Sequence, residues 1–390
     1  MRKGWEYKKL GEICSSDLGK TLNKSKDVGN MRPYLCAINI LWDSIDLTTL
    51  KEACFKDDEI DRYTVKYGDL LVCEGGDTGR AAIWDRKEPI LYQNALHRLR
   101  FKEDVDARFI MYNLWHKKQI GEIDHKYSKG VTILHLVKSA LLSIPILLPP
   151  LSTQLAIVSE LDKINELIRL KKEQLKDFDN LAQSLFYEMF GDPVENEKGW
   201  KVKKLGDICA DITDGDHMPP PKSEFGIPFI TISDIDKDTR CLNFENTFYV
   251  PEDYYNNLKE NRKPQKGDLL YTVTGSYGIP VIVKTDKKFC FQRHIALLRP
   301  NKEILSTIFL CYWVLSDGVK FMADKVATGI AQKTVGLNSI RKFSCILPPL
   351  PLQRLFAQRI EQIEREKSEV QKSIQDLETL LASRMQYWFE

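Results

Sequence analysis

Two long stretches of the chain place apolar residues at alternating steps of four and three positions. This spacing is a heptad seam, which lines up one apolar stripe along an α-helix. A helix of about 38 residues is roughly 55 Å long. The first seam comprises Ile157, Leu161, Ile164, Ile168, Lys171, Leu175, Phe178, Ala182, Leu185 and Met189; the second comprises Ile360, Ile363, Lys367, Val370, Ile374, Leu377, Leu381, Arg384 and Trp388.

The two seams share their phase and their boundaries. Each contains one internal lysine and follows a Leu-Pro-Pro-Leu step, at residues 148–151 and 347–350. The first ends at Phe190-Gly191-Asp192-Pro193, where glycine suits a left-handed C-terminal position and proline prevents continuation. An exposed apolar stripe needs a partner helix. A phase-matched pair within one chain favours intramolecular antiparallel pairing, with a dimerisation coiled coil between chains as the alternative.

The rest of the chain is a divergent duplication. Residues 4–14, GWEYKKLGEIC, match residues 199–209, GWKVKKLGDIC, at an offset of 195. Further matches share an offset of 199. They pair residues 67–71 with 266–270, Gln93 with Gln292, Arg100 with Arg299, Gly130 with Gly329, residues 148–151 with 347–350, and Gln154 with Gln353.

Between these matches the two halves differ almost completely. Short apolar runs bounded by Gly, Asp and Pro predict strands, whereas longer runs rich in Leu, Tyr and Trp predict core helices. The fold class is therefore mixed α/β (α+β), with two tandem globular domains. The predicted strands include residues 32–40, 69–73, 81–84, 226–234 and 281–284, and the predicted helices are residues 109–117 and 307–315.

Composition, charge distribution and cysteine spacing limit the classes of protein to which this chain can belong. The 390 residues are 43% hydrophobic and carry a net charge of +2. Residues 151–193 and 350–390 together hold 11 basic against 15 acidic residues, which leaves an excess of six positive charges elsewhere. That excess is compatible with a phosphate-facing surface without requiring one. Nine cysteines without a C-x-x-C pair, and no apolar run long enough to cross a membrane, are typical of a cytoplasmic protein.

Motifs that carry catalytic chemistry are missing. The sequence has no phosphate-binding loop, dinucleotide-binding glycine motif, His-Glu-x-x-His pair or nucleophile elbow. The Asn/Asp-Pro-Pro-aromatic signature of amino-methyltransferases is also absent, and the six histidines have no metal-ligand spacing. Residues 75–80, GGDTGR, lack the Lys-Ser/Thr of a phosphate cradle and are interpreted as a turn. The sequence predicts a chain without catalytic residues or a bound metal.

The paired Gly-Trp…Lys-Leu-Gly starts and the paired Leu-Pro-Pro-Leu-x-x-Gln helix starts resemble the specificity subunit of type I restriction-modification systems. Residues 188–193, EMFGDP, resemble the central spacer of that family. One departure is visible, since Thr153 and Leu352 stand where the family often has Glu. The resemblance covers nearly the whole chain.

The resemblance implies target recognition domains at residues 1–150 and 194–349, with spacer helices at 151–193 and 350–390. Each domain would read one half of a bipartite, asymmetric site in double-stranded DNA, and the helices would set the spacing. Two methyltransferase subunits would dock on the chain and bring S-adenosylmethionine. Restriction subunits would bring ATP and Mg²⁺, so no cofactor is expected in this chain.

Polar residues at predicted loop tips are the candidate DNA contacts, because Arg, Lys, Gln and Thr suit base edges and phosphates. Plain solvated loop residues are the alternative at each position. For the whole chain, the alternatives are a coiled-coil protein-binding scaffold without DNA specificity and an enzyme with an unrecognised site. The candidates are Asp77, Thr78, Arg80, Lys126, Lys129 and Thr132 in the first domain and Asp214, His217, Lys222, Ser276, Tyr277, Gln332 and Lys333 in the second.

Overall fold

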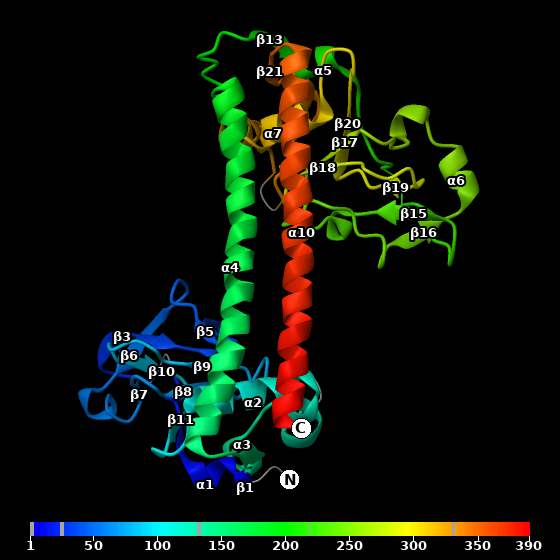
Figure 1. Cartoon of the computed structure of the whole chain (residues 1–390). Helices are drawn as coiled ribbons and strands as arrows, with labels where there is room; N and C mark the ends of the chain where they lie inside the picture. Colours follow the sequence, from blue (N-terminus) through cyan, green and yellow to red (C-terminus); the bar gives the residue numbers. More distant parts are fainter. Residues whose placement is uncertain (1–3, 24–26, 131–133, 218, 330–331) are drawn as a thin grey trace. The chain divides into compact units, whose positions relative to one another are not determined.

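The computed structural model describes residues 4–23, 27–130, 134–217, 219–329 and 332–390 (Figure 1). The chain divides into two compact units. Unit 1 contains residues 1–172 and 372–390, and unit 2 contains residues 173–371. Each unit therefore holds one globular domain together with part of both long helices. The duplication seen in the sequence is a duplication of these units.

The first globular domain is built on two four-stranded sheets and a two-stranded ribbon. The sheets have the orders β6-β3-β10-β7 and β2-β11-β8-β9, the ribbon joins β1 to β12, and β4 and β5 form a short antiparallel pair. The strands are β1 (Glu6–Lys9), β2 (Cys14–Leu18), β3 (Asn30–Leu35), β4 (Ile40–Leu41), β5 (Ser44–Ile45), β6 (Lys51–Phe55), β7 (Thr64–Val65), β8 (Leu70–Cys73), β9 (Ala81–Ile83), β10 (Ile90–Tyr92), β11 (Leu96–Phe101) and β12 (Pro145–Leu148). The helices are α1 (Leu10–Ile13), η1 (Ala37–Asn39), η2 (Asp57–Glu59), α2 (Ala107–Gln119), η3 (Ile123–Tyr127) and α3 (Lys138–Ser143).

The second globular domain repeats this plan. Its sheets have the orders β14-β20-β17-β18 and β16-β15-β19, with a ribbon of β13 and β21. The strands are β13 (Lys201–Lys204), β14 (Cys209–Asp214), β15 (Ile227–Ile230), β16 (Phe248–Val250), β17 (Leu269–Thr272), β18 (Pro280–Ile282), β19 (Cys290–Phe291), β20 (Ile295–Pro300) and β21 (Ser344–Leu347). The helices are α5 (Leu205–Ile208), η4 (Ile232–Asp234), α6 (Glu252–Asn256), η5 (Glu260–Arg262), α7 (Thr307–Leu315), α8 (Asp317–Val326) and α9 (Leu337–Arg341). The predicted mixed fold and tandem domains are confirmed.

The two heptad seams form the long helices α4 (Leu151–Phe190) and α10 (Leu350–Phe389) (Figure 1). Gly191 follows α4 with φ of 76°, the left-handed conformation expected at this helix end. Within unit 1, Glu160 accepts hydrogen bonds from Arg384 and Trp388. Within unit 2, Lys367 Nζ lies 2.8 Å from Asp179 Oδ1. Further along the helices, Lys172 pairs with Glu378 in unit 1 and Phe186 contacts Phe356 in unit 2, so in both units residue numbers rise along α4 as they fall along α10 and the segments pair antiparallel within one chain.

Most seam residues face inward in the structure. Ile157, Leu161, Ile164 and Ile168 are buried on α4, and Ile360, Ile363, Val370, Ile374 and Leu381 are buried on α10. Leu175, Phe178, Leu185 and Leu377 are half-buried. Three fully buried side chains that the periodicity did not indicate lie next to the seam and widen the packed stripe: Phe186, Phe190 and Met385. Phe356, also fully buried, continues the second seam one step before Ile360.

The repeated glutamines fasten each helix to its domain. Gln154 is buried; its carboxamide donates to the Asp104 and Pro149 carbonyls and accepts from the Asp106 amide at 2.8 Å. Gln353 makes the same three bonds with Ile304, Pro348 and Ser306. Each glutamine satisfies backbone groups at the start of a helix that would otherwise lose their partners. The match between these glutamines is therefore structural.

Candidate nucleic-acid interface

Loops of the second domain meet at one edge of its sheets. Strand register places Asp214, the end of β14, opposite Ala296, and Thr272, the end of β17, opposite Ile295. The Gln292 amide donates to the carbonyl of Ile230 at 3.0 Å, which joins the end of β15 to the same edge. Segments distant in sequence are thereby brought to one place.

A pocket of about 460 Å³ opens at this edge of the second domain. Ser276 and Gln332, both predicted contacts, line the pocket. The backbone of Lys333, a third predicted residue, joins two segments of the lining, because its carbonyl accepts a hydrogen bond from the Gly275 amide at 3.0 Å. Burial, together with neighbouring Arg293, lowers the pKa of His294. The pocket lining contains hydrogen-bonding side chains and no Lys, Arg, Asp or Glu; its members are Thr231, Ile232, Ser233, Thr274, Gly275, Ser276, Gln292, His294 and Gln332.

Of the predicted residues Asp214, His217 and Lys222, the first two form an ion pair at this edge of the domain. His217 Nε2 lies 3.0 Å from Asp214 Oδ2, and Arg262 lies 3.5 Å from the other carboxylate oxygen. Asp214 is thus occupied by internal partners. His217 is 60% exposed, and Lys222 is exposed with its ammonium 5.1 Å from the Phe248 ring centroid. The two exposed side chains remain available as surface contacts.

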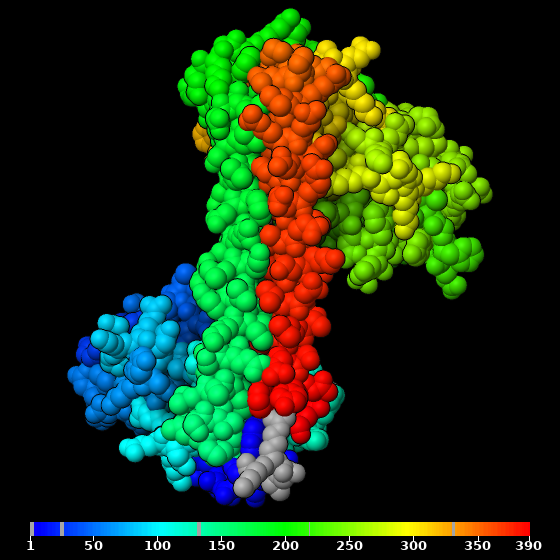
Figure 2. All heavy atoms as spheres, in the orientation of Figure 1, coloured from blue at the N-terminus to red at the C-terminus, as the bar shows by residue number. Residues whose placement is uncertain are grey.

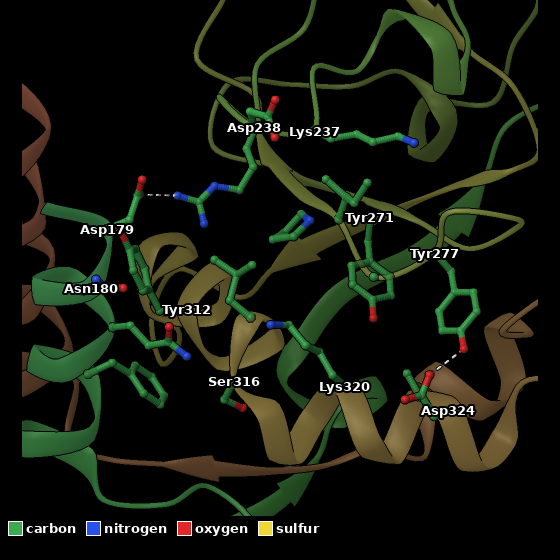
Figure 3. A pocket seen from close by; sticks show the side chains of 18 of the residues that line it. Asp179, Asn180, Lys237, Asp238, Tyr271, Tyr277, Tyr312, Ser316, Lys320 and Asp324 are labelled. Atoms are coloured by element: carbon green, nitrogen blue, oxygen red, sulfur yellow. Dashed lines mark hydrogen bonds and ion pairs between the residues drawn. The ribbon is translucent and has the colours of Figure 1, made fainter. Parts of the chain in front are cut away.

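Tyr277 faces a different cavity from its neighbour Ser276. Its hydroxyl donates to Asp324 on α8, and it lines a cavity of about 600 Å³ between α4 and the second domain (Figure 3). Arg240 pairs there with Asp179 at 3.2 Å. The buried hydroxyl of Tyr271 lacks a hydrogen-bond partner among the described residues. The bond to Asp324 fixes the loop of Tyr277, and the role of Tyr277 as a DNA contact stays a prediction.

In the first domain, the 75–80 turn is held from within, and the burial of Thr78 corrects one of the predicted contacts, whereas Asp77 and Arg80 stay predictions. Thr78 is buried and its hydroxyl bonds with Asp124 at 2.8 Å, so the side chain does not reach the surface. Arg80 donates to the carbonyl of Ala37 at 2.9 Å and lies 3.5 Å from Asp77. Asp77 in turn pairs with Lys118 at 3.0 Å. Sequence spacing could not reveal these partners because they are distant in the chain.

The loop around Gly130 lies against this turn. Lys129 and His135 exchange backbone hydrogen bonds of 2.9 and 2.8 Å, and Gly75 forms a bridge with His135. Lys129 is exposed, and Lys126 is 67% exposed and 3.4 Å from Glu122. These two lysines stay predictions as phosphate contacts. Thr132, the remaining candidate, lies outside the described residues.

Sequence reasoning missed Thr231, Ser233 and His294 on the pocket of the second domain. Thr231 precedes the short helix η4, and its amide and hydroxyl both donate to Asp234. This turn aims Ser233 at the edge. Ser233 lies inside the strand predicted at residues 226–234, whereas the structure ends β15 at Ile230 and places Ser233 in η4, so the sequence had no signal that set this serine apart.

Within the described ranges, no cluster of three or more His, Cys, Asp or Glu side chains is arranged to hold a metal ion. No helix in the part of the chain covered by the structure is long and apolar enough to span a membrane.

Two structurally repeated domains with unlike loop surfaces, joined to antiparallel helices, define a class of two-part recognition proteins. The model of the type I restriction modification DNA specificity domain matches residues 2–177 and again residues 197–379. The chain belongs to this family, and its role is that of a specificity subunit without catalysis of its own. The predicted family and function are confirmed.

Two similar proteins are also named as specificity subunits of type I restriction enzymes. The putative type I restriction enzyme MjaX specificity subunit of Methanocaldococcus jannaschii is 24% identical over 97% of this chain and 92% of its own length. The EcoBI specificity subunit of Escherichia coli is 24% identical over 80% of this chain and 70% of its own length.

Solved structures share the fold. A chain from a study of complex assembly and conformational transition of the type I R-M system aligns with a TM-score of 0.62 at 19% identity, covering 100% of this chain and 98% of that one. The S subunit of a type I system from M. genitalium aligns with a TM-score of 0.52 at 14% identity, covering 99% and 96%.

Proposed function

We propose that each globular domain reads one half of a bipartite, asymmetric site in double-stranded DNA. The observation that carries this proposal is the repeated strand edge with unlike side chains: one frame presents Ser233, Ser276 and His294 in the second domain, whereas the equivalent loops of the first domain hold Ile38, Asp77 and Ala95. Unlike side chains at equivalent places select unlike bases, because base edges differ in their donors and acceptors.

The long helices supply the rest of the proposed role. They set the number of unread base pairs between the half-sites and offer docking surfaces to other subunits. Both helices have uncovered surface on the face drawn in Figure 2. Leu181 on α4 is 52% exposed, and its repeat partner Leu380 on α10 is 45% exposed. Exposed leucines at equivalent positions fit two copies of one partner.

These partners would be two methyltransferase subunits, which carry S-adenosylmethionine, and restriction subunits, which use ATP and Mg²⁺. The chain itself would contribute sequence selection. A second pair of equivalent exposed apolar residues, Tyr7 at 65% and Val202 at 48%, extends the docking surface onto the two ribbons.

Methylation mapping tests the proposal directly. Cells expressing this chain with its methyltransferase should methylate adenine in one two-part asymmetric motif, and the motif should vanish when the chain is deleted. Unchanged methylation after deletion, with no sequence-selective binding by the purified complex, would contradict the proposed function.

A further inference from the structure

Gln93 and Gln292 are equivalent residues built into equivalent backbone. Their amides donate to the carbonyls of Leu35 and Ile230, both at 3.0 Å. Their carbonyls accept from the amides of Leu96 and Ile295, both at 3.1 Å. Each also forms an isolated parallel bridge, Gln93 with Lys20 and Gln292 with Asp216. The two glutamines therefore occupy one position of the repeated frame.

A glycine packs against each of these glutamines. A Cβ on Gly19 would lie 2.3 Å from the Gln93 carbonyl carbon, and a Cβ on Gly215 would lie 2.5 Å from the Gln292 carbonyl carbon. Such close approach of two backbones excludes any side chain at the glycine. Both halves thus fix the glutamine backbone tightly at the edge where strands end.

The side chains of these two glutamines make no hydrogen bond to the described part of the chain. Other repeated polar residues are engaged: Gln154 and Gln353 bond backbone groups, and Asp268 pairs with Arg299 at 2.8 Å. By contrast, the carboxamides of Gln93 and Gln292 have no hydrogen-bond partner in the ranges that the structure describes, although both residues are half-buried. A position that keeps glutamine in both halves, without using it internally, points to an external partner common to both.

The surroundings of Gln292 favour a base edge over a phosphate. Gln292 lines the 460 Å³ pocket, and the described residues of its lining include no Lys, Arg, Asp or Glu. The two cations next to the wall already have partners there, since Lys237 donates to the Ser276 hydroxyl at 3.1 Å and Arg293 to His294 Nε2 at 3.3 Å. Phosphate contacts draw on Lys and Arg, whereas a carboxamide presents one donor beside one acceptor, the pair that matches N7 and the N6 amino group of adenine in the major groove.

We propose that Gln93 and Gln292 each read an adenine at the same relative position of the two half-sites, so that both halves of an otherwise asymmetric motif share one base pair. This inference rests on the proposed function. The remaining pocket residues, which differ between the domains, select the bases that are not shared.

The test uses the full complex of this chain with its methyltransferase subunits. Its motif is first mapped by methylation, and binding is then measured on duplexes in which each motif position is substituted in turn. Gln292→Leu should reduce discrimination at one adenine of one half-site by about ten- to a hundred-fold. Gln93→Leu should do the same at the equivalent adenine of the other half-site, with other positions unchanged.

Gln358→Leu, at an exposed position of α10, is the matched control and should leave every preference intact. Unfolding temperature and co-purification with the methyltransferase report that the variants fold and assemble. Retention of full discrimination by both variants, or an equal loss at every motif position as a phosphate contact would give, overturns the inference. A wild-type complex without any two-part motif would instead refute the proposed function.

Discussion

At the residue scale, a buried ion pair fixes the same turn in both domains. Asp268, whose side chain is 2% exposed, accepts two hydrogen bonds from Arg299 at 3.0 and 2.8 Å and one from the Gln265 amide. Asp69 and Arg100 repeat the arrangement. Removing one partner leaves a charge and a donor without compensation in a poorly hydrated place.

Asp268→Ala should therefore lower the free energy of unfolding of the second domain by about 3 kcal/mol. Asp286→Ala is the matched control, because Asp286 is 80% exposed and its partner Lys266, 3.4 Å away, is 61% exposed. An exposed pair of this kind contributes less than about 1 kcal/mol. Denaturant unfolding of both variants measures the difference in the free energy of unfolding. Equal losses would show that the buried ion pair stabilises the domain no more than the exposed one.

His97 predicts a pH dependence of stability. The residue is fully buried, and burial lowers the pKa of its imidazole below the usual 6.5. Below pH 6.5 the unfolded chain then binds a proton that the folded chain does not, so the free energy of unfolding falls as the pH falls. His97→Asn should flatten the loss of thermal stability between pH 7.5 and 5.5. An unchanged slope in this variant would assign the dependence to other groups.

At the scale of elements, periodic features could be predicted and long-range contacts could not. The heptad seam identified α4 and α10 because each step depends only on neighbouring turns. The helix predicted at residues 307–315 coincides with α7. The burial of Thr78 depends on Asp124, 46 residues away, and the widening of the seam depends on Phe356 meeting Phe186 on the other helix. Such partners are set by the tertiary fold.

The candidate site shows the same limit. Ser276 and Gln332 were predicted from loop composition and lie on one pocket, whereas their neighbour Tyr277 turns to Asp324. Adjacent loop residues can face opposite sides of a turn, and loop composition has no period that distinguishes them. The repeated Gln93 and Gln292 were visible as matches, but only the structure shows that their side chains have no partner among the residues it describes.

The exposed leucines of the helices carry the next prediction. Leu181→Glu and Leu380→Glu place a charge where the proposed methyltransferase subunits dock, so each should remove one copy from the purified complex, and the double variant should remove both. Lys176→Glu and Gln375→Glu are matched controls at repeat-equivalent exposed positions of α4 and α10, roughly 140° around each helix from the leucines. Mass measurement of the complex gives the stoichiometry. Two bound copies in the double variant would exclude these leucines as docking contacts.

At the scale of the whole molecule, the duplication keeps the residues that hold each unit together alike and lets the residues of the edge loops differ. Residues that bond within a unit, such as Gln154, Gln353, Asp69 and Asp268, are alike in both halves because the frame needs them. Loops on the strand edges can differ because each domain holds its own loops with its own contacts, such as Thr78 with Asp124 in the first domain and Tyr277 with Asp324 in the second. One architecture can therefore present two unrelated surfaces, which suits recognition of an asymmetric site.

The proposed spacing role of the helices predicts how the motif responds to helix length. Inserting seven helix-forming residues after Lys172 and after Gln371, where the two units divide, preserves the heptad register of both helices. Seven residues add about 10 Å of helix, which corresponds to roughly three base pairs of B-DNA. Methylation mapping should then show both half-sites unchanged and a spacer longer by about that number.

Two further insertions separate helix length from helix pairing. Four residues in both helices lengthen them by about 6 Å but rotate the seam, so apolar side chains leave the interface and stability should fall. Seven residues in α4 alone leave the helices unequal, and the complex should lose its defined spacer. If the seven-residue double insertion folds, assembles and still methylates the original spacing, the helices do not set the distance between half-sites, and the domains must be positioned by their partner subunits.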